Sequence, residues 1–448
     1  MATVADVRIR SSRRAEAFLL ALAIAIAVGA YALVGLGATG GVPANVWFYG
    51  IGTASLALAG HAALRAWARA ADPVLFPAAF ALNGVGLAMI YRLDLGRAEA
   101  GAASHYATRQ LAWSVIGVTL AVLVIVALRD HRLLRRFTYT TMVAGLTFLL
   151  LPLLPGLGRE RRGARLWIEV FGMSFQPAEI AKILLAIFFA GYLVNHRDSL
   201  ALAGPRVLGI RFPRVRDLGP ILLAWIASIA VLVYEKDLGT SMLFFGLFVA
   251  MLYIATERLS WVLLGVGLFG VGSVVAGVIF PHVAARYDVW LHALDPAVYD
   301  KSPGGSEQLV RGLFGLASGG LFGTGLGEGL PGQVPFAESD FIVASLGEEL
   351  GLTGLMALLA LYLIVVERAF RTAIGMRDGF GKLLAAGLGF TVALQLFVVV
   401  GGVTRLIPLT GLTTPFLAYG GSSLLANWIV VGLLLRMSHD SRREEATP

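Results

Sequence analysis

The chain has 448 residues, of which 57% are hydrophobic and only 14% are charged, and its formal net charge is +8. Soluble domains carry roughly 25% charged residues, so this composition excludes an ordinary soluble protein. The sequence contains no cysteine, which excludes disulfides, iron–sulfur clusters and thiol catalysis.

The apolar residues occur in blocks of about twenty, which is the length of a helix that crosses a bilayer. The strands of a transmembrane barrel would be shorter and would alternate in polarity. The sequence therefore predicts an all-α, polytopic membrane protein with about twelve spans. Nine spans precede a long polar loop and three follow it. They are 17–36, 47–64, 75–91, 110–128, 137–154, 178–195, 219–234, 238–256, 260–280, 341–366, 383–403 and 415–435.

The basic residues predict the orientation of these spans. Cytoplasmic loops carry an excess of Lys and Arg, and most of the 36 basic residues fall on one side if the N-terminus is cytoplasmic. Both termini are then cytoplasmic, and the long loop, residues 281–340, is extracytoplasmic. A basic stretch at 158–165 is an exception, because it also falls outside. Since topology explains most of the charge, we do not expect nucleic acid to bind.

Two familiar kinds of site are excluded by spacing. The seven histidines show no HExxH or other metal-ligand pattern, and no P-loop is present. A glycine run at 319–327 has the spacing of a dinucleotide loop but no strand before it, which argues against that function. The run is explained by close backbone packing or a turn, or by the approach of a lipid headgroup.

Charged residues at the edges of spans are candidates for function, because they are costly there unless they are paired or hydrated. Glu179 and Lys182 lie three residues apart at the start of a span and so share one helix face. They form either a structural ion pair or a contact with substrate. Asp237 lies at the junction of two predicted spans, where it either caps the helix that follows or belongs to a functional site.

The long loop and the spans after it contain further polar residues. Asp295 and Asp300 lie near basic residues in the loop, whereas Glu348 and Glu349 lie within an apolar span. Residues 408–423 combine prolines, glycines and hydroxyl side chains. Irregular backbone at membrane depth is tolerated where it is buried or lines a wet cavity, so we interpret this segment as a cavity wall.

Six short segments resemble the SEDS family (shape, elongation, division and sporulation), which includes RodA, FtsW and SpoVE. In chain order they are GARLW at 163–167, QPAEIAK at 176–182, EKDLGTS at 235–241, SGGLFGTGLG at 318–327, ESDFIVASLGEELG at 338–351 and PLTGLTTPFLAYGGSS at 408–423. The resemblance spans about residues 105–437. The amino-acid sequence of residues 401–416 is similar to that of RodA-like proteins of actinobacteria.

The resemblance implies a peptidoglycan glycosyltransferase that polymerises lipid II at the outer face of the bacterial cytoplasmic membrane. It favours a role in elongation and cell shape over division, with a class B penicillin-binding protein as partner and membrane lipids around the spans. Many members have ten spans, so residues 1–104 would contain a cytoplasmic tail and two extra spans. Residues 105–437 would be the glycosyltransferase core, and 438–448 a cytoplasmic tail.

The resemblance also implies functional residues. The family's essential aspartate corresponds to Asp300, the expected general base, with Asp295 as the competing assignment. Apolar surroundings would raise the pKa of such a base, and cations would stabilise the departing pyrophosphate. Expected substrate contacts are Arg165, Glu179, Lys182, Asp237, Arg311, Glu348, Ser422 and Ser423. No protein metal ligand and no organic cofactor are expected, although Mg²⁺ or Mn²⁺ could accompany the pyrophosphate.

The chain departs from the family pattern at several positions. Ala178 replaces the serine of the QPSE motif, Ala418 replaces the serine of SYGGSS, and Arg311-Gly312 stands where a Gln-Ser pair is frequent. Two other functions remain open: a transporter of lipid-linked precursors and a non-catalytic scaffold for a penicillin-binding protein. The small number of charges in the middle of the spans weighs against the transporter.

Overall fold

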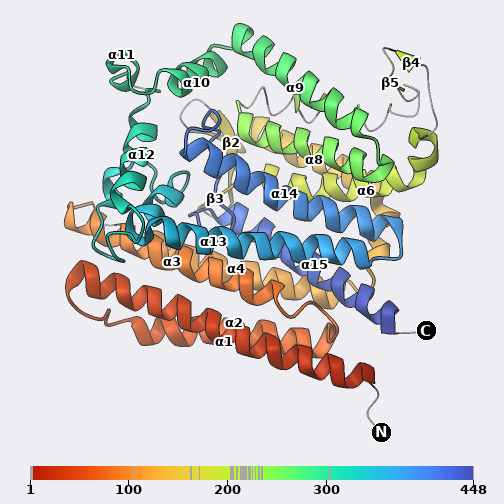
Figure 1. The fold of residues 1–448 in the computed structure, drawn as a ribbon, viewed down its shortest axis with the longest axis horizontal. Helices are drawn as coiled ribbons and strands as arrows, with labels where there is room; N and C mark the ends of the chain where they lie inside the picture. The colour runs from red at the N-terminus through yellow and green to blue at the C-terminus, as the bar shows by residue number, and fades with distance from the viewer. Residues whose placement is uncertain are drawn as a thin grey trace. The chain divides into compact units, whose positions relative to one another are not determined.

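The computed structural model describes residues 4–102, 104–161, 164–170, 172–201, 236–301 and 304–446, together with a few isolated positions from 206 to 233. Helices dominate these residues (Figure 1). The long helices are α1 (Val4–Thr39), α2 (Val46–Trp67), α3 (Leu75–Glu99), α4 (Tyr106–Ala127), α5 (Thr138–Leu150), α6 (Ala178–Ala201), α8 (Leu238–Thr256), α9 (Leu259–Ile279), α13 (Ile342–Gly375), α14 (Gly379–Val403) and α15 (Gly421–Ala446).

The described helices confirm the prediction of a helical, multi-pass membrane protein. Within the described residues, ten helices are long and apolar enough to cross a bilayer. They correspond to ten of the twelve expected spans. The span expected at 47–64 is also a helix, α2, although it falls outside those ten. The span expected at 219–234 lies outside the described residues apart from isolated positions.

The chain divides into two compact units. Unit 1 comprises Met1–Arg129, Asp288–Arg368 and Gln395–Pro448, and unit 2 comprises Asp130–Tyr287 and Ala369–Leu394. Each unit is therefore built from segments that are distant in the sequence.

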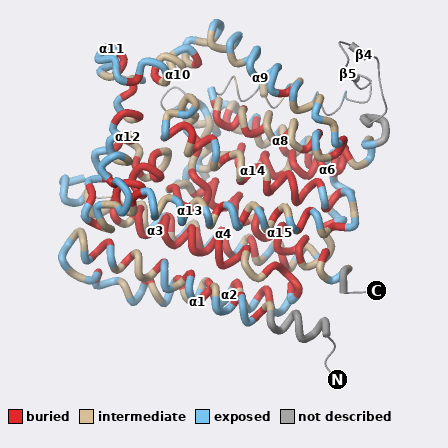
Figure 2. The backbone as a smooth tube through the Cα atoms, in the orientation of Figure 1, coloured by how far each residue is buried: buried red, intermediate tan, exposed pale blue. Residues whose placement is uncertain are grey.

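In unit 1, α1 and α2 run beside α3 and α4, and α15 packs against both α3 and α4 (Figure 1). Helix α3 is the most deeply buried, with 94% of its spanning stretch inside the protein, as Figure 2 shows. Small residues permit this packing, because membrane helices associate through close van der Waals contact rather than through the hydrophobic effect. A Cβ atom at Gly84 would lie 2.3 Å from the Cβ of Ala27 on α1.

In unit 2, α6 packs against α5 and α8, and α8 packs against α9. A small antiparallel sheet precedes α6, with the strand order β1 (Gly158–Arg161), β2 (Ala164–Val170) and β3 (Met173–Phe175). The basic stretch at 158–165 therefore forms most of a hairpin, which the sequence analysis did not predict. Its residues 162 and 163 lie outside the described residues.

The long loop at 281–340 also contains short helices. They are α10 (Pro281–Leu291), α11 (Pro296–Tyr299), α12 (Glu307–Gly319) and the 3-10 turn η3 (Pro331–Gln333). Within unit 1, Val298, Val310 and Phe341 join a buried apolar cluster that links α11 and α12 to the start of α13. The loop is thus anchored by an apolar cluster that it shares with helices of unit 1.

We predict that Gly84→Ala destabilises the protein by about 1–3 kcal/mol, because the added methyl group overpacks the α1–α3 contact. The measurement is the thermal unfolding midpoint of the purified protein in detergent. Gly52→Ala on α2 is the matched control, since nothing lies within 4 Å of its new Cβ atom. Equal midpoints for the two variants would contradict the prediction.

Candidate functional site

The start of α6 places a buried ion pair in unit 2. The helix begins directly after Pro177, a residue suited to the first turn. Lys182 Nζ lies 2.8 Å from Glu179 Oε2, and the two side chains are only 5% and 9% exposed. The predicted pair on one helix face is therefore formed and almost fully buried.

Asp237 lies at the N-terminus of α8, where its carboxylate accepts a hydrogen bond of 2.9 Å from the Thr240 N–H. The Gln176 side-chain amide donates a second hydrogen bond of 3.1 Å. Burial raises the pKa of Asp237. The hydrogen bonds from Thr240 and the charge of Arg286 lower this pKa, whereas the charge of Glu179 raises it, and the net effect is a raised pKa. Segment 176–182 and the described residues of segment 235–241 thus meet in one group of charged residues.

Arg286 belongs to the same electrostatic neighbourhood, on α10. The sequence analysis did not single it out. The available signal was its positive charge, because a basic residue in a loop that is predicted to be extracytoplasmic is an exception to the orientation rule.

Arg165 occupies a different environment in unit 2. It lies on β2, and its guanidinium is 3.4 Å from Glu160, with both side chains more than half exposed. Exposed pairs of this kind contribute roughly 0–1 kcal/mol. The Arg165 guanidinium is thus accessible rather than fixed by its partner.

The two aspartates of the long loop have different surroundings in unit 1. Asp295 caps α11, because its carboxylate accepts a hydrogen bond of 2.9 Å from the Ala297 N–H. Asp300 follows the same short helix, and its side chain is exposed. Within the described part of the chain, no hydrogen bond or ion pair holds the Asp300 carboxylate. Asp295 therefore has a structural role that Asp300 lacks.

Arg311 on α12 connects to the residue beside Asp300. It forms a side-chain hydrogen bond with Tyr299, which raises the pKa of Arg311. It also donates a hydrogen bond of 3.1 Å to the Gln333 carbonyl and pairs with Glu307 at 2.8 Å. The structure therefore brings a positive charge to the residue that precedes Asp300.

Glu348 and Glu349 hold the glycine loop, which we define as residues 319–330. Glu348 Oε1 accepts a hydrogen bond of 2.7 Å from the Leu330 N–H, and Glu349 Oε2 accepts one of 2.9 Å from the Gly327 N–H. Arg92 on α3 pairs with Glu349 Oε1 at 2.9 Å and donates to the Gly329 carbonyl at 2.7 Å. The sequence analysis did not predict this pairing, since Arg92 and Glu349 are far apart in the chain.

The glycines of this loop permit close backbone packing. Gly323 has a φ angle of +82°, and a Cβ atom there would lie 2.2 Å from the Glu349 carbonyl oxygen. Gly325 and Gly327 also have positive φ angles, of +105° and +90°, which glycine adopts without strain. Close packing, one of the predicted explanations for the glycine run, is what the structure shows.

Residues 408–420 are non-helical, as predicted, and lead into α15. Ser422 and Ser423 begin that helix and are each 7% exposed. The Ser423 oxygens accept hydrogen bonds from the Asn427 side chain at 2.7 and 3.2 Å. Both serines therefore contribute to a buried helix start rather than to an open surface.

Glu338 and Arg97 fix this segment to α3, and the sequence analysis did not assign either of them. The Glu338 carbonyl accepts a hydrogen bond of 2.7 Å from the Tyr419 N–H. Its carboxylate lies 2.7 Å from Arg97, whose guanidinium carbon is 4.6 Å from the centre of the Tyr106 ring. These contacts join residues 408–420 to the ends of α3 and α4.

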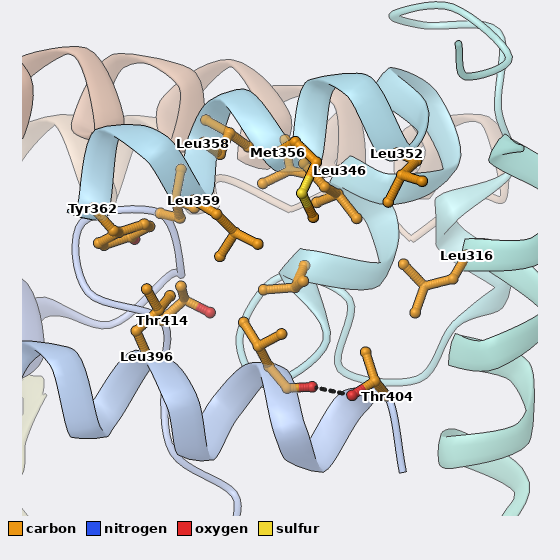
Figure 3. A pocket seen from close by; sticks show the side chains of 14 residues that line it. Leu316, Leu346, Leu352, Met356, Leu358, Leu359, Tyr362, Leu396, Thr404 and Thr414 are labelled. Atoms are coloured by element: carbon orange, nitrogen blue, oxygen red, sulfur yellow. Dashed lines mark hydrogen bonds between the residues drawn. The ribbon is translucent and has the colours of Figure 1, made fainter. Parts of the chain in front are cut away.

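A small apolar cavity of about 130 Å³ lies among α12, α13, α14 and residues 414–417 of unit 1 (Figure 3). A cavity of roughly this size can hold a molecule such as benzene. Its lining includes Leu316, Leu359 and Tyr362 but no charged residue. It can therefore hold a short piece of hydrocarbon, but not a charged headgroup.

We predict that Glu349→Ala destabilises the protein by about 3–5 kcal/mol, because the change leaves the Arg92 charge buried without its partner. The measurement is again the thermal unfolding midpoint in detergent. Glu328→Ala is the control, since Glu328 lies in the same loop but is exposed. A Glu349→Ala protein as stable as the control would show that the ion pair does not hold the loop.

Comparison with known proteins agrees with this architecture. The family model named for FtsW, RodA and SpoVE, described as a cell cycle protein, matches residues 73–443. The peptidoglycan glycosyltransferase RodA of Mycobacterium tuberculosis is 50% identical over 433 residues, which cover 96% of this chain and 91% of the relative. Stage V sporulation protein E of Bacillus subtilis is 33% identical over 365 residues, covering 80% of this chain and 94% of the relative.

Solved structures give the same result. A structure titled as the coordination of polymerization and crosslinking by a peptidoglycan synthase complex matches with a TM-score of 0.65 at 25% identity, over 83% of this chain and 98% of the other. The crystal structure of the rod shape determining protein RodA of Thermus thermophilus matches with a TM-score of 0.58 at 25% identity, over 83% of this chain and 97% of the other. The resemblance stated from the six sequence segments is confirmed. This chain belongs to the FtsW/RodA/SpoVE family, which is the SEDS family.

Proposed function

We propose that the chain polymerises lipid II into glycan strands at the outer face of the bacterial cytoplasmic membrane, with Asp300 as the general base. That the chain is a peptidoglycan glycosyltransferase follows from its 50% identity, over 96% of its length, to proteins of that name. The observation that supports Asp300 is its exposed carboxylate, which has no structural partner among the described residues, whereas Asp295 is used as a helix cap.

The reaction needs a base that removes a proton and a positive charge that stabilises the departing pyrophosphate. A hydroxyl group of the acceptor sugar gives its proton to the Asp300 carboxylate as its oxygen attacks the anomeric carbon of the donor sugar. The bond from that carbon to the pyrophosphate oxygen breaks, and the lipid pyrophosphate leaves with the bonding electrons. A positioned base contributes roughly 10²–10⁴-fold to the rate of such a step.

Arg311 is suited to stabilise the negative charge beside this base. Its guanidinium donates a hydrogen bond to the Gln333 carbonyl and interacts with Tyr299, the residue before Asp300. Arginine binds phosphate well because its planar group makes paired hydrogen bonds.

We assign the Glu179–Lys182–Asp237 group of unit 2 to contacts with the substrate headgroup. Its charges are buried at helix starts, where a membrane protein retains them mainly for function. Burial raises the pKa of Asp237, so its ionised form lowers the stability of the fold. A residue kept at a cost to stability is typical of a functional site. Arg165, Glu348, Ser422 and Ser423 stay predicted substrate contacts, although the last three have structural partners in their own unit.

That a divalent cation takes part in the reaction stays a proposal. Among the described residues, the acid and imidazole groups close enough together to hold an ion include neither Asp300 nor Asp237. Among the described residues, Asp300 and Asp237 therefore form no cation site by themselves, so Mg²⁺ or Mn²⁺ would have to be bound largely by the pyrophosphate. The steps proposed above use side chains of the chain alone.

The orientation and the partner are proposals with separate support. The distribution of basic residues supports cytoplasmic termini and an outward-facing long loop. A solved structure with a TM-score of 0.65 is titled as a peptidoglycan synthase complex that coordinates polymerization and crosslinking. This supports a class B penicillin-binding protein as the partner. The RodA relatives support elongation over division as the process served.

We predict that Asp300→Asn lowers the rate of lipid II polymerisation by about 10²–10⁴-fold, because the amide cannot accept the proton. Gel analysis of glycan strands made by the purified, reconstituted protein measures this rate. Asp295→Asn is the matched control, since asparagine caps helices as well as aspartate does, and it should remain active.

Other outcomes of this assay have distinct meanings. Normal strand formation by folded Asp300→Asn would sink the proposed mechanism and leave the scaffold and the transporter as explanations. Loss of activity in Asp295→Asn alone would transfer the role of base to Asp295.

We predict that Asp237→Asn is at least as stable as the unmodified chain at pH 7.5 but polymerises poorly. The folded pKa of Asp237 is raised above the unfolded value of about 3.9, so the folded state binds more protons between the two values. Stability associated with Asp237 is full below the unfolded pKa and is lost as pH rises through the folded pKa. Asparagine removes this loss, so the advantage of the variant should vanish near pH 4. A variant less stable than the unmodified chain at every pH would contradict the prediction.

A further inference from the structure

The outer end of α1 contacts the glycine loop through the backbone. A Cβ atom at Gly37 would lie 2.2 Å from the Leu326 carbonyl oxygen and 3.0 Å from the Gly327 Cα. A Cβ atom at Gly327 would lie 2.6 Å from the backbone nitrogen of Ala38 and 2.7 Å from the Val34 carbonyl oxygen. Only glycine permits this approach on either side, so the two segments are in direct backbone contact.

The Leu326 side chain strengthens this contact. It packs against a buried cluster that includes Tyr31 and Val34 of α1 and Tyr49 of α2. The Tyr31 ring stacks between Tyr49 and Tyr91, with centroid distances of 4.1 and 4.2 Å. Stacked aromatic pairs add to the stabilisation that comes from the area they bury. The α1–α2 pair is therefore a rigid support on one side of the loop.

The opposite side of the glycine loop is held by Arg92, Glu348 and Glu349, as described above. Immediately after Leu330 comes the turn η3, whose Gln333 carbonyl accepts the hydrogen bond from Arg311. A displacement of the loop would therefore move the backbone atom that orients Arg311. Arg311 in turn contacts Tyr299, the neighbour of Asp300.

The α1–α2 pair lies outside the residues that the family model matches. That match begins at residue 73, after α2 ends at Trp67. The contact between α1 and the glycine loop is thus an addition to the part of the chain that the family model matches.

We propose that the α1–α2 pair is a positioning element for catalysis: Gly37 and Leu326 fix the glycine loop, which fixes Gln333 and thereby the Arg311 guanidinium, whose other contact is Tyr299, the residue before Asp300. Gly37 is accordingly a positioning residue. This inference rests on the proposed function, because Arg311 and Asp300 are assigned to the reaction there.

The test compares Gly37→Ala with Gly29→Ala. Both positions lie on α1, but nothing is within 4 Å of a Cβ atom at Gly29, whereas Gly37 meets the loop backbone. Gly41→Ala, also with open space, controls for changes near the end of the helix. Each variant is assayed for kcat and KM in lipid II polymerisation and for its thermal unfolding midpoint.

A spectroscopic measurement separates positioning from general stability. Because the chain has no cysteine, Glu328→Cys carries a single spin label on an exposed position of the glycine loop. Thr119→Cys on the exposed side of α4 serves as the reference label. Gly37→Ala should change the spectrum at residue 328 but not at residue 119, and Gly29→Ala should change neither.

The expected kinetic result is a fall in kcat of about 10- to 100-fold for Gly37→Ala, because small misplacements of a catalytic group have effects of that order. KM should change much less, and Gly29→Ala should retain normal kcat. If Gly37→Ala does not fold, Leu326→Ala replaces it, since this change removes packing against the tyrosines without a clash. It should give a smaller change in the same direction.

Two results would overturn the inference. One is a changed spectrum at residue 328 with normal kcat. The other is an unchanged spectrum at that residue for both Gly37→Ala and Leu326→Ala. Failure of the proposed function is recognised separately, as normal polymerisation by Asp300→Asn, whatever the spectra show.

Discussion

Arg92 and Glu349 place opposite charges 2.9 Å apart inside unit 1, with side chains only 8% and 0% exposed. A buried ion pair is stable only when its remaining donors and acceptors are also satisfied. Here the Gly329 carbonyl and the Gly327 N–H provide those partners. The pair therefore joins α3 to α13 and at the same time fixes the backbone of the glycine loop between them. The position of η3, and through it of Arg311, depends on this arrangement.

The irregular segment at 408–420 also needs partners for buried donors and acceptors, which here belong to its backbone. Backbone groups cannot be left unpaired where water is absent, and side chains from several helices satisfy them. Gln110 donates to the Ala418 carbonyl at 3.0 Å, Gln395 donates to the Thr413 carbonyl at 2.8 Å, and Tyr362 donates to the Pro415 carbonyl. Gly86 allows the close approach of this segment to α3, because a Cβ atom there would lie 2.5 Å from the Leu417 carbonyl oxygen. Non-helical backbone is thus held in a defined conformation beside the start of α15.

Much of the fold and part of the site could be predicted without coordinates. The helices coincide with the apolar blocks because a bilayer requires such blocks, and the Glu179–Lys182 pair follows from helical spacing alone. The small sheet at 158–175 was not predicted, since short, basic strands carry no strong periodic signal. The roles of Glu348 and Glu349 were also not predictable. Their partners lie on other segments, and a carboxylate in an apolar helix suits a substrate contact as well as a structural one.

The sequence by itself determined the membrane class, the positions of most spans, the family and the loop that carries Asp300, because each depends on local composition or on short, ordered motifs. Only the tertiary structure decided how the two loop aspartates differ, since Asp295 is used as a helix cap and Asp300 is exposed. It also decided that the glycine run packs against Glu349 rather than forming a nucleotide loop, and that α1 contacts that run at Gly37. The last of these features arises from a contact between residues that are hundreds of positions apart. The physical reason is that close backbone approach and buried charge pairing depend on which segments meet, which no local pattern specifies.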